Sequence, residues 1–513
     1  MSSPPEQPAR WLERLGQGVP GLLLAFVAGA VLTTAFAPFY LSPLAVISPA
    51  LLLLLMHGRS PARAALLGFG FGLGLFGSGV SWVYVSIHNF GNMAAPLAVV
   101  AVLIFVSILA AYIAGFGWLI ALVGSRISTP FLYGMIAPAL WVLLEWVRSW
   151  LFSGFPWLNL GYSQAGWPLA GLAPWLGVYG ISLAVAVSAG LLAWVVREST
   201  NWKPVVLASF VLWSGAWGLG QASFTEPDGN AIDVAVIQNN VPLRQKWGTN
   251  RQRVIQGYVE ATRTQQDADL VVWPEAAVPV YWYGQEQGLR AELASVLEAG
   301  TTVVIGAPER EQSNGKMRAF NSAFIVSGSA DNDALQSYRK RHLVPFGEYI
   351  PVKPLFDWLL NVLHIPMSDF SPGENGDMRY RVNGHLAAMS ICYEDSFGEE
   401  LIEQLPEAGL IINLSEDAWF GNSLAPHQRV QIARMRVLET GRPLVRAANT
   451  GPSLVVNADG TIAARTPQFE TAVLRATLQP TRGATPYVVI GNSGVLVLIG
   501  AMLIPLAWAK RKY

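Results

Sequence analysis

Apolar residues dominate the first 220 positions of this chain, and one further apolar run lies near its end. A helix needs about 20 mainly apolar residues to cross the hydrocarbon core of a bilayer. Eight segments match or approach that length, and we predict that each spans a membrane: 19–37, 41–57, 64–86, 95–123, 130–147, 168–196, 203–221 and 486–508. The second and fifth of these are short. The pattern therefore predicts a membrane α-helical bundle of eight spans.

Between about residues 223 and 485 the pattern changes to short strands and amphipathic helices. Residues 232–238 alternate as a strand does, and residues 250–266 show the period of an amphipathic helix. Further strands are predicted at 270–273, 302–305, 321–327, 335–339, 385–392, 410–414, 443–446, 453–456 and 471–475, with helices near 285–299, 396–406 and 427–440. Strands that alternate with helices and are interrupted by hairpins predict a layered α/β domain with sheet in the middle.

Four parts are thus predicted along the chain: a bundle of seven spans at 1–222, a water-soluble domain at 230–480, a last span at 486–508 and a basic tail at 509–513. Hydrophobic residues make up 52% of the chain and charged residues 13%, with a mean hydropathy of +0.37. Ordinary globular domains carry about 25% charged residues. The 34 basic and 34 acidic residues balance, so no net field indicates a nucleic-acid partner.

The basic residues also predict how the chain is oriented, because Lys and Arg accumulate in cytoplasmic loops. With eight spans, five basic clusters fall on one side, and the alternate loops 37–43 and 87–95 carry no Lys or Arg. The clusters are Arg10 with Arg14, Arg59 with Arg63, Arg126, Arg197 with Lys203, and Lys510 to Lys512. Both chain ends are then cytoplasmic and the domain at 230–480 lies outside, with Arg148 as the one exception.

The stretch from His385 to Asp395 is the most unusual part of the soluble segment. An apolar strand ends there in Cys392, and acidic residues follow at once. Cys392 is the only cysteine among 513 residues, so it cannot form an intrachain disulfide. A lone thiol at a strand end is either a buried small hydrophobe, which is common for free cysteine, or a nucleophile. The local sequence leaves both interpretations open.

Two other motifs carry charged groups near strand ends. Val272-Trp-Pro-Glu275 leads a strand into a carboxylate, and Tyr338-Arg-Lys340 opens a run that continues through Leu-Val-Pro-Phe-Gly to Glu348. Each is weak alone, because a Glu after a strand is usually solvated and a basic run is usually a solvated face or a lipid headgroup contact. Read together with Cys392, they place a carboxylate, an ammonium and a thiol where all three could converge at one sheet edge.

Such a trio divides the work of acyl transfer. A thiolate is the nucleophile, and its pKa falls near a cation or a helix N-terminus. A Glu within reach can take the thiol proton and pass it to the leaving group. A Lys can stabilise the oxyanion of the tetrahedral intermediate together with a backbone N–H after the Cys. The Cys then carries the acyl group as a thioester, which splits one difficult step into two.

These motifs, with Ile391-Cys-Tyr-Glu394, resemble the Glu-Lys-Cys signature of the nitrilase superfamily, whose fold is an α-β-β-α sandwich. Such a domain between seven preceding spans and one following resembles the bacterial apolipoprotein N-acyltransferase family. Gln238-Asn-Asn-Val-Pro242 with Trp247, and Ser415-Glu-Asp-Ala-Trp-Phe-Gly421, match it further. Many relatives have Asn where this chain has Glu416, a departure that concerns local structure rather than the triad.

The resemblance implies that Cys392 takes the sn-1 acyl chain of a phospholipid, typically phosphatidylethanolamine. The α-amine of a diacylglyceryl-cysteine at the start of an apolipoprotein then receives it. Glu275 is implied as the base, Lys340 as the oxyanion stabiliser and Glu348 as a supporting carboxylate. The residues implied to shape the site or bind substrate are Trp247, Tyr393, Glu394 and Trp419. The implied location is a Gram-negative inner membrane with the domain on the periplasmic side; nothing in the sequence demands an oligomer, so we expect a monomer.

Residues 349–384 interrupt the α/β pattern, and their apolar part at 349–366 is either a packed helix or a lid that dips into the bilayer surface. A membrane-anchored amidase of the nitrilase type is the alternative function, although one anchor would suffice for it. A transporter or receptor would not need the trio and would usually show polar breaks in its helices. No G-x-S-x-G elbow, Walker A loop or His/Cys metal spacing is present, so no cofactor is implied.

Overall fold

The computed structural model describes residues 16–198, 202–247, 250–283, 286–297, 300–313, 315–327, 336–351, 369–374 and 380–508. They form two compact units, which are described separately. One comprises the chain up to Tyr84, Pro96–Ala222 and the chain from Ile490; the other comprises Val85–Ala95 and Ser223–Val489. Most of the predicted lid at 349–384, and the basic tail at 509–513, lie outside the described residues.

The first unit is helical, and each predicted apolar segment forms a helix. The helices are α2 (Gly18–Leu32), α3 (Leu44–Met56), α4 (Pro61–Gly79), α5 (Trp82–Val85), α6 (Ala95–Gly124), α7 (Thr129–Phe131), α8 (Ala137–Arg148), α9 (Ala173–Arg197), α10 (Trp202–Leu219) and α18 (Ser493–Trp508). α5 continues as a π-turn at Ser86–Phe90, and α18 follows the short α17 (Pro486–Ile490).

Fewer of these helices qualify as spans than the eight that the sequence predicted. Within the described residues, four stretches are long and apolar enough: Gly18–Ala35, Ala95–Gly124, Thr129–Arg148 and Pro168–Arg197. A fifth is added if Pro61–Gly79 and Trp82–Phe90, bent by 51°, form one span. The 13 residues of α3 reach only about 20 Å at 1.5 Å per residue, short of a core of about 30 Å. The chain therefore has the helical region of a membrane protein, with four to five candidate spans.

Close backbone contact between α2 and α4 shows how this unit packs. A Cβ added at Gly29 would lie 1.9 Å from the carbonyl oxygen of Phe71, and one at Gly74 would lie 2.0 Å from that of Phe26. Small residues allow helices to approach closely where lipid offers no hydrophobic driving force for their association. Both glycines are therefore required by the α2–α4 interface.

The second unit contains two six-stranded sheets. In order across the first sheet, the strands are β13 (Ala472–Leu478), β2 (Ile232–Gln238), β3 (Leu270–Val272), β4 (Thr302–Ser313), β5 (Lys316–Ser327) and β6 (Gln336–Arg339). The second sheet has β12 (Ile462–Arg465), β11 (Leu454–Val456), β10 (Leu444–Ala448), β9 (Leu410–Ser415), β8 (His385–Ile391) and β7 (Tyr380–Val382). A separate pair joins β1 (Thr225–Pro227) to β14 (Thr481–Gly483).

Each large sheet has a parallel centre and antiparallel edges. β2, β3 and β4 run parallel, as do β8, β9 and β10, and the flanking strands pair antiparallel to them. Buried side chains of the parallel strands, such as Val234, Val272, Met389 and Ile412, fill the space between the two sheets. Strands buried on both faces form continuous apolar runs, and for that reason the sequence alone predicts them.

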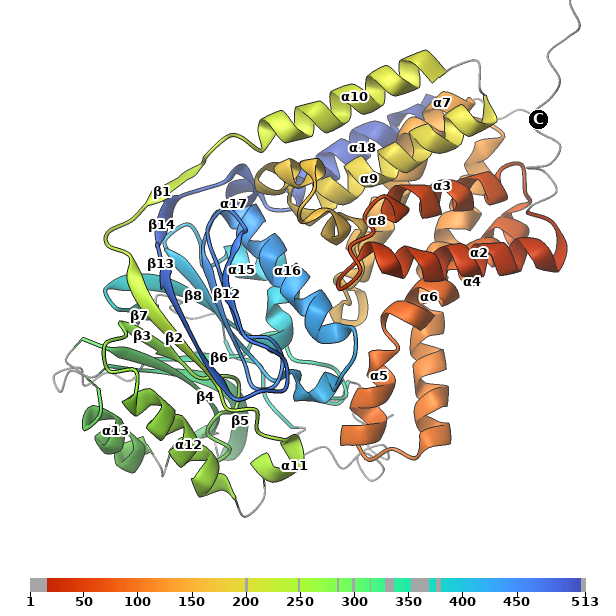
Figure 1. Cartoon of the computed structure of the whole chain (residues 1–513). Helices are drawn as coiled ribbons and strands as arrows, with labels where there is room; N and C mark the ends of the chain where they lie inside the picture. Colours follow the sequence, from red (N-terminus) through yellow and green to blue (C-terminus); the bar gives the residue numbers. More distant parts are fainter. Residues whose placement is uncertain are drawn as a thin grey trace, which may run out of the picture. The chain divides into compact units, whose positions relative to one another are not determined.

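Helices cover both outer faces of this sheet pair (Figure 1). α12 (Arg251–Arg263) and α13 (Glu286–Ala294) pack on the first sheet through a core that includes Tyr258 and Trp273. α15 (Gly398–Ile402) and α16 (Ala425–Thr440) pack on the second, through residues such as Leu401 and Val437. The order of layers is α-β-β-α, and the expected sandwich is confirmed.

This topology places chemistry at strand ends. Glu275 lies three residues beyond β3, Lys340 directly follows β6 and Cys392 directly follows β8. In open α/β sheets, ligands bind outside the carboxyl ends of parallel strands. Two of the three predicted groups therefore leave parallel strands at the edge where such sheets form their sites.

Candidate active site

Cys392 lies at a sharp turn between β8 and a 3₁₀ turn at Cys392–Ser396. Its φ is +53°, a left-handed conformation that is uncommon outside glycine and that clusters at functional sites. Its carbonyl oxygen accepts hydrogen bonds from Arg429 Nη2 at 2.6 Å and Asn413 Nδ2 at 3.3 Å. The residue as a whole is partly exposed. Two buried side chains, Arg429 and Asn413, thus hold the strained turn through its carbonyl oxygen.

Lys340 is buried and meets two carboxylates. Its Nζ lies 2.8 Å from Glu348 Oε2 and 3.9 Å from Glu275 Oε1. Its backbone N–H donates to the carbonyl of Asn321, in β5, at 2.8 Å. Burial lowers the pKa of Lys340, but the carboxylates of Glu348 and Glu275 outweigh that effect, and the net pKa lies above the usual lysine value. The side chain is therefore an ammonium at neutral pH.

Glu275 is 7% exposed, and its two carboxylate oxygens have different surroundings. Oε1 accepts a hydrogen bond from Asn321 Nδ2 at 2.7 Å. Oε2 is buried, and no hydrogen-bond partner reaches it among the described residues. Burial raises the pKa of Glu275; Lys340 opposes this and Glu348 adds to it. A carboxylate with a raised pKa and an open oxygen is suited to accept and return a proton.

The thiol of Cys392 is electrostatically close to both groups. Burial raises its pKa to about 11, and the Glu275 carboxylate adds to that rise, whereas Arg429 and Lys340 oppose it. The expectation that a nearby cation lowers the thiol pKa therefore holds for each cation, but burial and the carboxylate outweigh them. Cys392 rests as a neutral thiol at neutral pH. The thiol proton must therefore leave as the sulfur attacks. Glu275 is the candidate acceptor, because its carboxylate acts on the pKa of the Cys392 thiol.

Glu348 and Asn321 join these groups into one network. Glu348 Oε1 accepts from Lys340 Nζ and from Asn321 Nδ2, each at 2.9 Å, and its Oε2 accepts from the backbone N–H of Val344 at 2.8 Å. Asn321 thereby bridges Glu275 and Glu348. Because every polar atom in such a network restricts its neighbours, the network fixes the positions of Glu275 and Lys340.

Glu394 connects the turn at Cys392 to the loop that carries Lys340. Its Oε2 accepts from Tyr338 Oη at 2.8 Å and from the backbone N–H of Ile391 at 2.7 Å. Its Oε1 accepts from the backbone N–H groups of Arg341 at 2.7 Å and His342 at 3.0 Å. Both oxygens are used in holding backbone, so Glu394 positions the site. The neighbouring Tyr393 is 8% exposed and packs edge-on against Phe397, with ring centroids 5.0 Å apart.

The two predicted tryptophans lie on other loops. Trp247 directly follows α11 (Leu243–Lys246) and is partly buried. Trp419 lies in a 3₁₀ turn at Asp417–Phe420, where its carbonyl accepts from Ser86 Oγ at 2.9 Å. Its ring stands edge-on to Phe90 at 6.0 Å. The structure thus places Trp419 against the segment Val85–Ala95, and its predicted role in substrate binding stays a prediction.

Sequence reasoning missed three polar residues of this site: Lys246, Asn321 and Arg429. Arg429 directly follows His427-Gln428 and lies in α16 one face-repeat before Arg436, which is also buried. Lys246 pairs with Glu416, the position identified from the sequence as a departure from the family pattern. The unusual acidic residue at 416 was the available signal for Lys246, whereas Asn321 and Arg429 are ordinary polar residues in their own segments. No group of three or more His, Cys, Asp or Glu side chains that could hold a metal occurs in the described part of the chain.

A carboxylate, a buried ammonium and a thiol, gathered by two sheets of an α-β-β-α sandwich, define a carbon-nitrogen hydrolase domain, and residues 233–487 match the model of that family. Residues 28–191 match the apolipoprotein N-acyltransferase N-terminal domain. The chain is 45% identical over 488 residues to apolipoprotein N-acyltransferase from Nitrosomonas europaea, which covers 94% of this chain and 96% of that protein. The Methylococcus capsulatus protein of the same name is 40% identical over 496 residues, with 96% of each chain covered. The chain belongs to the apolipoprotein N-acyltransferase family.

Proposed function

We propose that this protein is an N-acyltransferase that moves the sn-1 acyl chain of a phospholipid, through a thioester on Cys392, to the α-amine of a diacylglyceryl-cysteine at the start of an apolipoprotein. The observation that carries the proposal is a buried Lys340–Glu275 pair, 3.9 Å apart, whose two charges both act on the pKa of the Cys392 thiol. The pair belongs to a chain whose N-terminal region matches the N-terminal domain of these acyltransferases.

In the first half-reaction, Sγ of Cys392 attacks the ester carbonyl of the lipid while its proton passes to Glu275. The ammonium of Lys340 faces the oxyanion that develops, which is where a fixed cation lowers the barrier most. Collapse of the tetrahedral intermediate breaks the ester C–O bond. The lysophospholipid oxygen leaves with the proton that Glu275 returns, and the acyl group stays on sulfur as a thioester.

In the second half-reaction, the amine of the acceptor attacks the thioester carbonyl. Glu275 removes a proton from the attacking nitrogen, and Lys340 again faces the oxyanion. The C–S bond breaks, the thiol is restored with the proton held on Glu275, and the product is an amide. Glu348, Glu394, Tyr393, Trp247 and Trp419 are assigned to shaping the site or binding substrate in both steps.

Both substrates reside in the bilayer, which explains why a hydrolase-like domain is joined to a membrane region. Four to five helices of the described chain are candidate spans. The distribution of Lys and Arg supports the finer proposal of eight spans, with the domain on the periplasmic side of a bacterial inner membrane. Phosphatidylethanolamine is the proposed donor, and a monomer is the proposed working unit.

The test uses the purified full-length protein and vesicles containing phosphatidylethanolamine with a labelled sn-1 chain. We expect a hydroxylamine-sensitive adduct on wild type and none on Cys392→Ala. Addition of a diacylglyceryl-cysteinyl peptide should then move the label into the peptide as an amide. Release of labelled fatty acid without transfer, together with turnover of a soluble amide, would instead identify a membrane-anchored amidase.

A further inference from the structure

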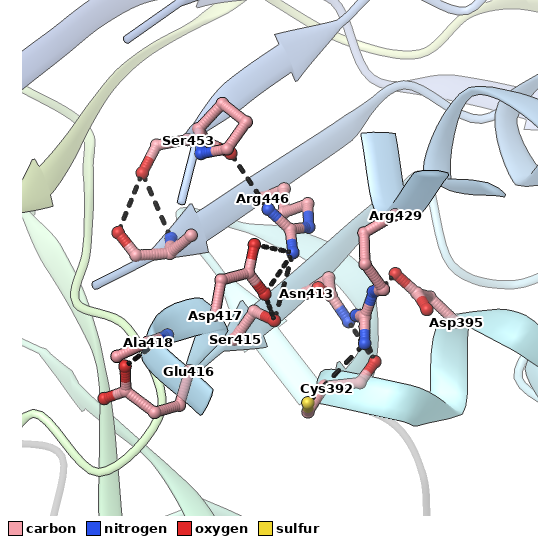
Figure 2. Close-up of polar contacts among 12 residues, drawn as sticks. Cys392, Asp395, Asn413, Ser415, Glu416, Asp417, Ala418, Arg429, Arg446 and Ser453 are labelled. Atoms are coloured by element: carbon pink, nitrogen blue, oxygen red, sulfur yellow. Dashed lines mark hydrogen bonds and ion pairs between the residues drawn. The ribbon is translucent and has the colours of Figure 1, made fainter. Parts of the chain in front are cut away.

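Arg429 aims its guanidinium at the nucleophile. It projects from α16, its side chain is fully buried, and Nη1 lies 3.5 Å from Sγ of Cys392. Nη2 donates to the carbonyl oxygen of Cys392 at 2.6 Å and to Asp395 Oδ2 at 2.9 Å. Figure 2 shows this fork reaching the sulfur, the carbonyl and the carboxylate of one turn. The contact to sulfur sets Arg429 apart from the other contacts that hold the turn.

The hydrogen bonds of two other buried arginines of the domain, Arg442 and Arg446, go to oxygen atoms. Arg442 donates to the carbonyls of Ala408 at 2.5 Å, Pro406 at 2.8 Å and Gly483 at 2.5 Å. Arg446 donates to Asp417 and to the carbonyl of Pro452 (Figure 2). A neutral thiol is a weak acceptor, so a buried guanidinium gains little from it at rest. The same N–H group becomes a strong, charge-assisted donor once the sulfur is negative.

We propose that Arg429 is a second catalytic cation, which donates from Nη1 to Sγ of Cys392 and stabilises the sulfur whenever it carries negative charge. The proposal rests on the proposed function in one respect, that Cys392 is the nucleophile. Negative charge reaches the sulfur twice: as its proton leaves for Glu275, and as the C–S bond of the thioester breaks. Lys340, held between Glu275 and Glu348, stabilises negative charge on the carbonyl oxygen of the substrate. Arg429 stabilises negative charge on the sulfur.

The charges around the thiol determine the direction of each effect. Glu275 and Asp417 raise the pKa of Cys392, whereas Arg429 and Lys340 lower it. Asp395 is 0% exposed and pairs with Arg429, and so offsets part of the charge that the guanidinium presents to sulfur. Loss of Arg429 should therefore raise the thiol pKa, and loss of the Asp395 charge should lower it. A merely structural ion pair would give the two variants the same kind of defect.

Alkylation of Cys392 by iodoacetamide, followed from pH 6 to pH 10 by mass spectrometry, measures these shifts in the full-length protein. The chain has only one cysteine, so the signal is unambiguous. We expect Arg429→Gln to shift the curve of alkylation rate against pH to higher pH by about one pH unit or more. At pH 8 the alkylation rate should then be at least about tenfold lower than that of wild type. Asp395→Asn should shift the same curve to lower pH. The curve of Arg429→Lys should lie between those of Arg429→Gln and wild type.

Arg442→Gln is the matched control, because it removes a buried arginine of the same domain that does not contact the sulfur. Its alkylation curve should coincide with that of wild type. Coincidence of the Arg429→Gln curve with wild type, or a shift of Asp395→Asn in the same direction as Arg429→Gln, would overturn the proposal. If Arg429→Gln does not fold, the direction of the Asp395→Asn shift decides. Iodoacetamide needs no lipid, so failure here is distinguishable from failure of lipid acyl transfer.

Discussion

Lys246 donates a hydrogen bond from Nζ to the backbone carbonyl of Glu275 at 2.9 Å. The lysine is fully buried and forms an ion pair with Glu416, whose carboxylate also accepts from Asn449 Nδ2 at 3.0 and 3.1 Å. A buried charge pair thus holds the backbone of Glu275, whereas Lys340 lies near its carboxylate. Glu416 therefore helps to position the proposed base, Glu275, through Lys246.

Lys246→Met should destabilise the protein strongly, because it leaves Glu416 buried without its cation. Removal of one partner of a buried pair costs about 3–5 kcal/mol. The double variant Lys246→Met/Glu416→Gln should recover part of that loss in thermal unfolding. Removal of the exposed pair Arg482–Glu226, at 65% and 66% exposure, should cost less than about 1 kcal/mol and serves as the comparison. Equal losses for both pairs would contradict the buried role.

Glu275→Gln should separate proton transfer from thiol reactivity. The variant lacks the proposed base, so acyl adduct formation from phosphatidylethanolamine should fall by about 100-fold or more. Alkylation of Cys392 by iodoacetamide at pH 8 should become faster, because the carboxylate that raises the thiol pKa is gone. Slower alkylation in a folded variant would show that Glu275 acts on the sulfur by another route.

Lys340→Met should impair both reactions. Loss of the cation that faces the oxyanion should lower the rate of adduct formation by about 100-fold or more. Alkylation should also slow, because Lys340 lowers the pKa of Cys392. Parallel losses in the two assays are expected here, whereas Glu275→Gln should give opposite changes. An unchanged alkylation curve would remove Lys340 from the electrostatic surroundings of the thiol.

The rate of acyl adduct formation should fall on acidification at a higher pH than an ordinary glutamate would predict. Glu275 must be ionised to accept the proton, and burial raises its pKa. The activity is therefore present above the raised pKa and lost as the pH falls through it, above the model-peptide value of about 4.3. Initial rates between pH 4 and pH 9 check this, with the melting temperature followed in parallel. A rate that stays constant down to pH 4 in folded protein would contradict the assignment.

Glu394→Gln should weaken the link between the two loops of the site. One oxygen of Glu394 accepts from two backbone N–H groups, and an amide nitrogen turned toward them would replace attraction with repulsion. We expect a lower rate of adduct formation together with a lower melting temperature. Glu400→Gln, in the following helix α15 at a partly exposed contact with His342, should have a much smaller effect on both.

The sequence alone determined the approximate positions of the helices along the chain and the layered α/β architecture of the second unit. It also contained the motifs around Glu275, Lys340 and Cys392. Hydrophobic period and motif spacing are local properties, so they could be recognised without coordinates. The number of spans was less well determined, because apolar composition does not fix helix length: α3 has 13 residues where the sequence predicted a span over 41–57.

Only the tertiary structure decided which charges meet. Lys246, Asn321 and Arg429 come from three elements far apart along the chain, and each is an ordinary polar residue in its own segment. Their contacts with Glu275 and Cys392 exist because the two sheets and α16 bring strand ends and one helix face together. Burial then makes those contacts strong, since a charge removed from water interacts with its neighbours through a lower effective dielectric constant.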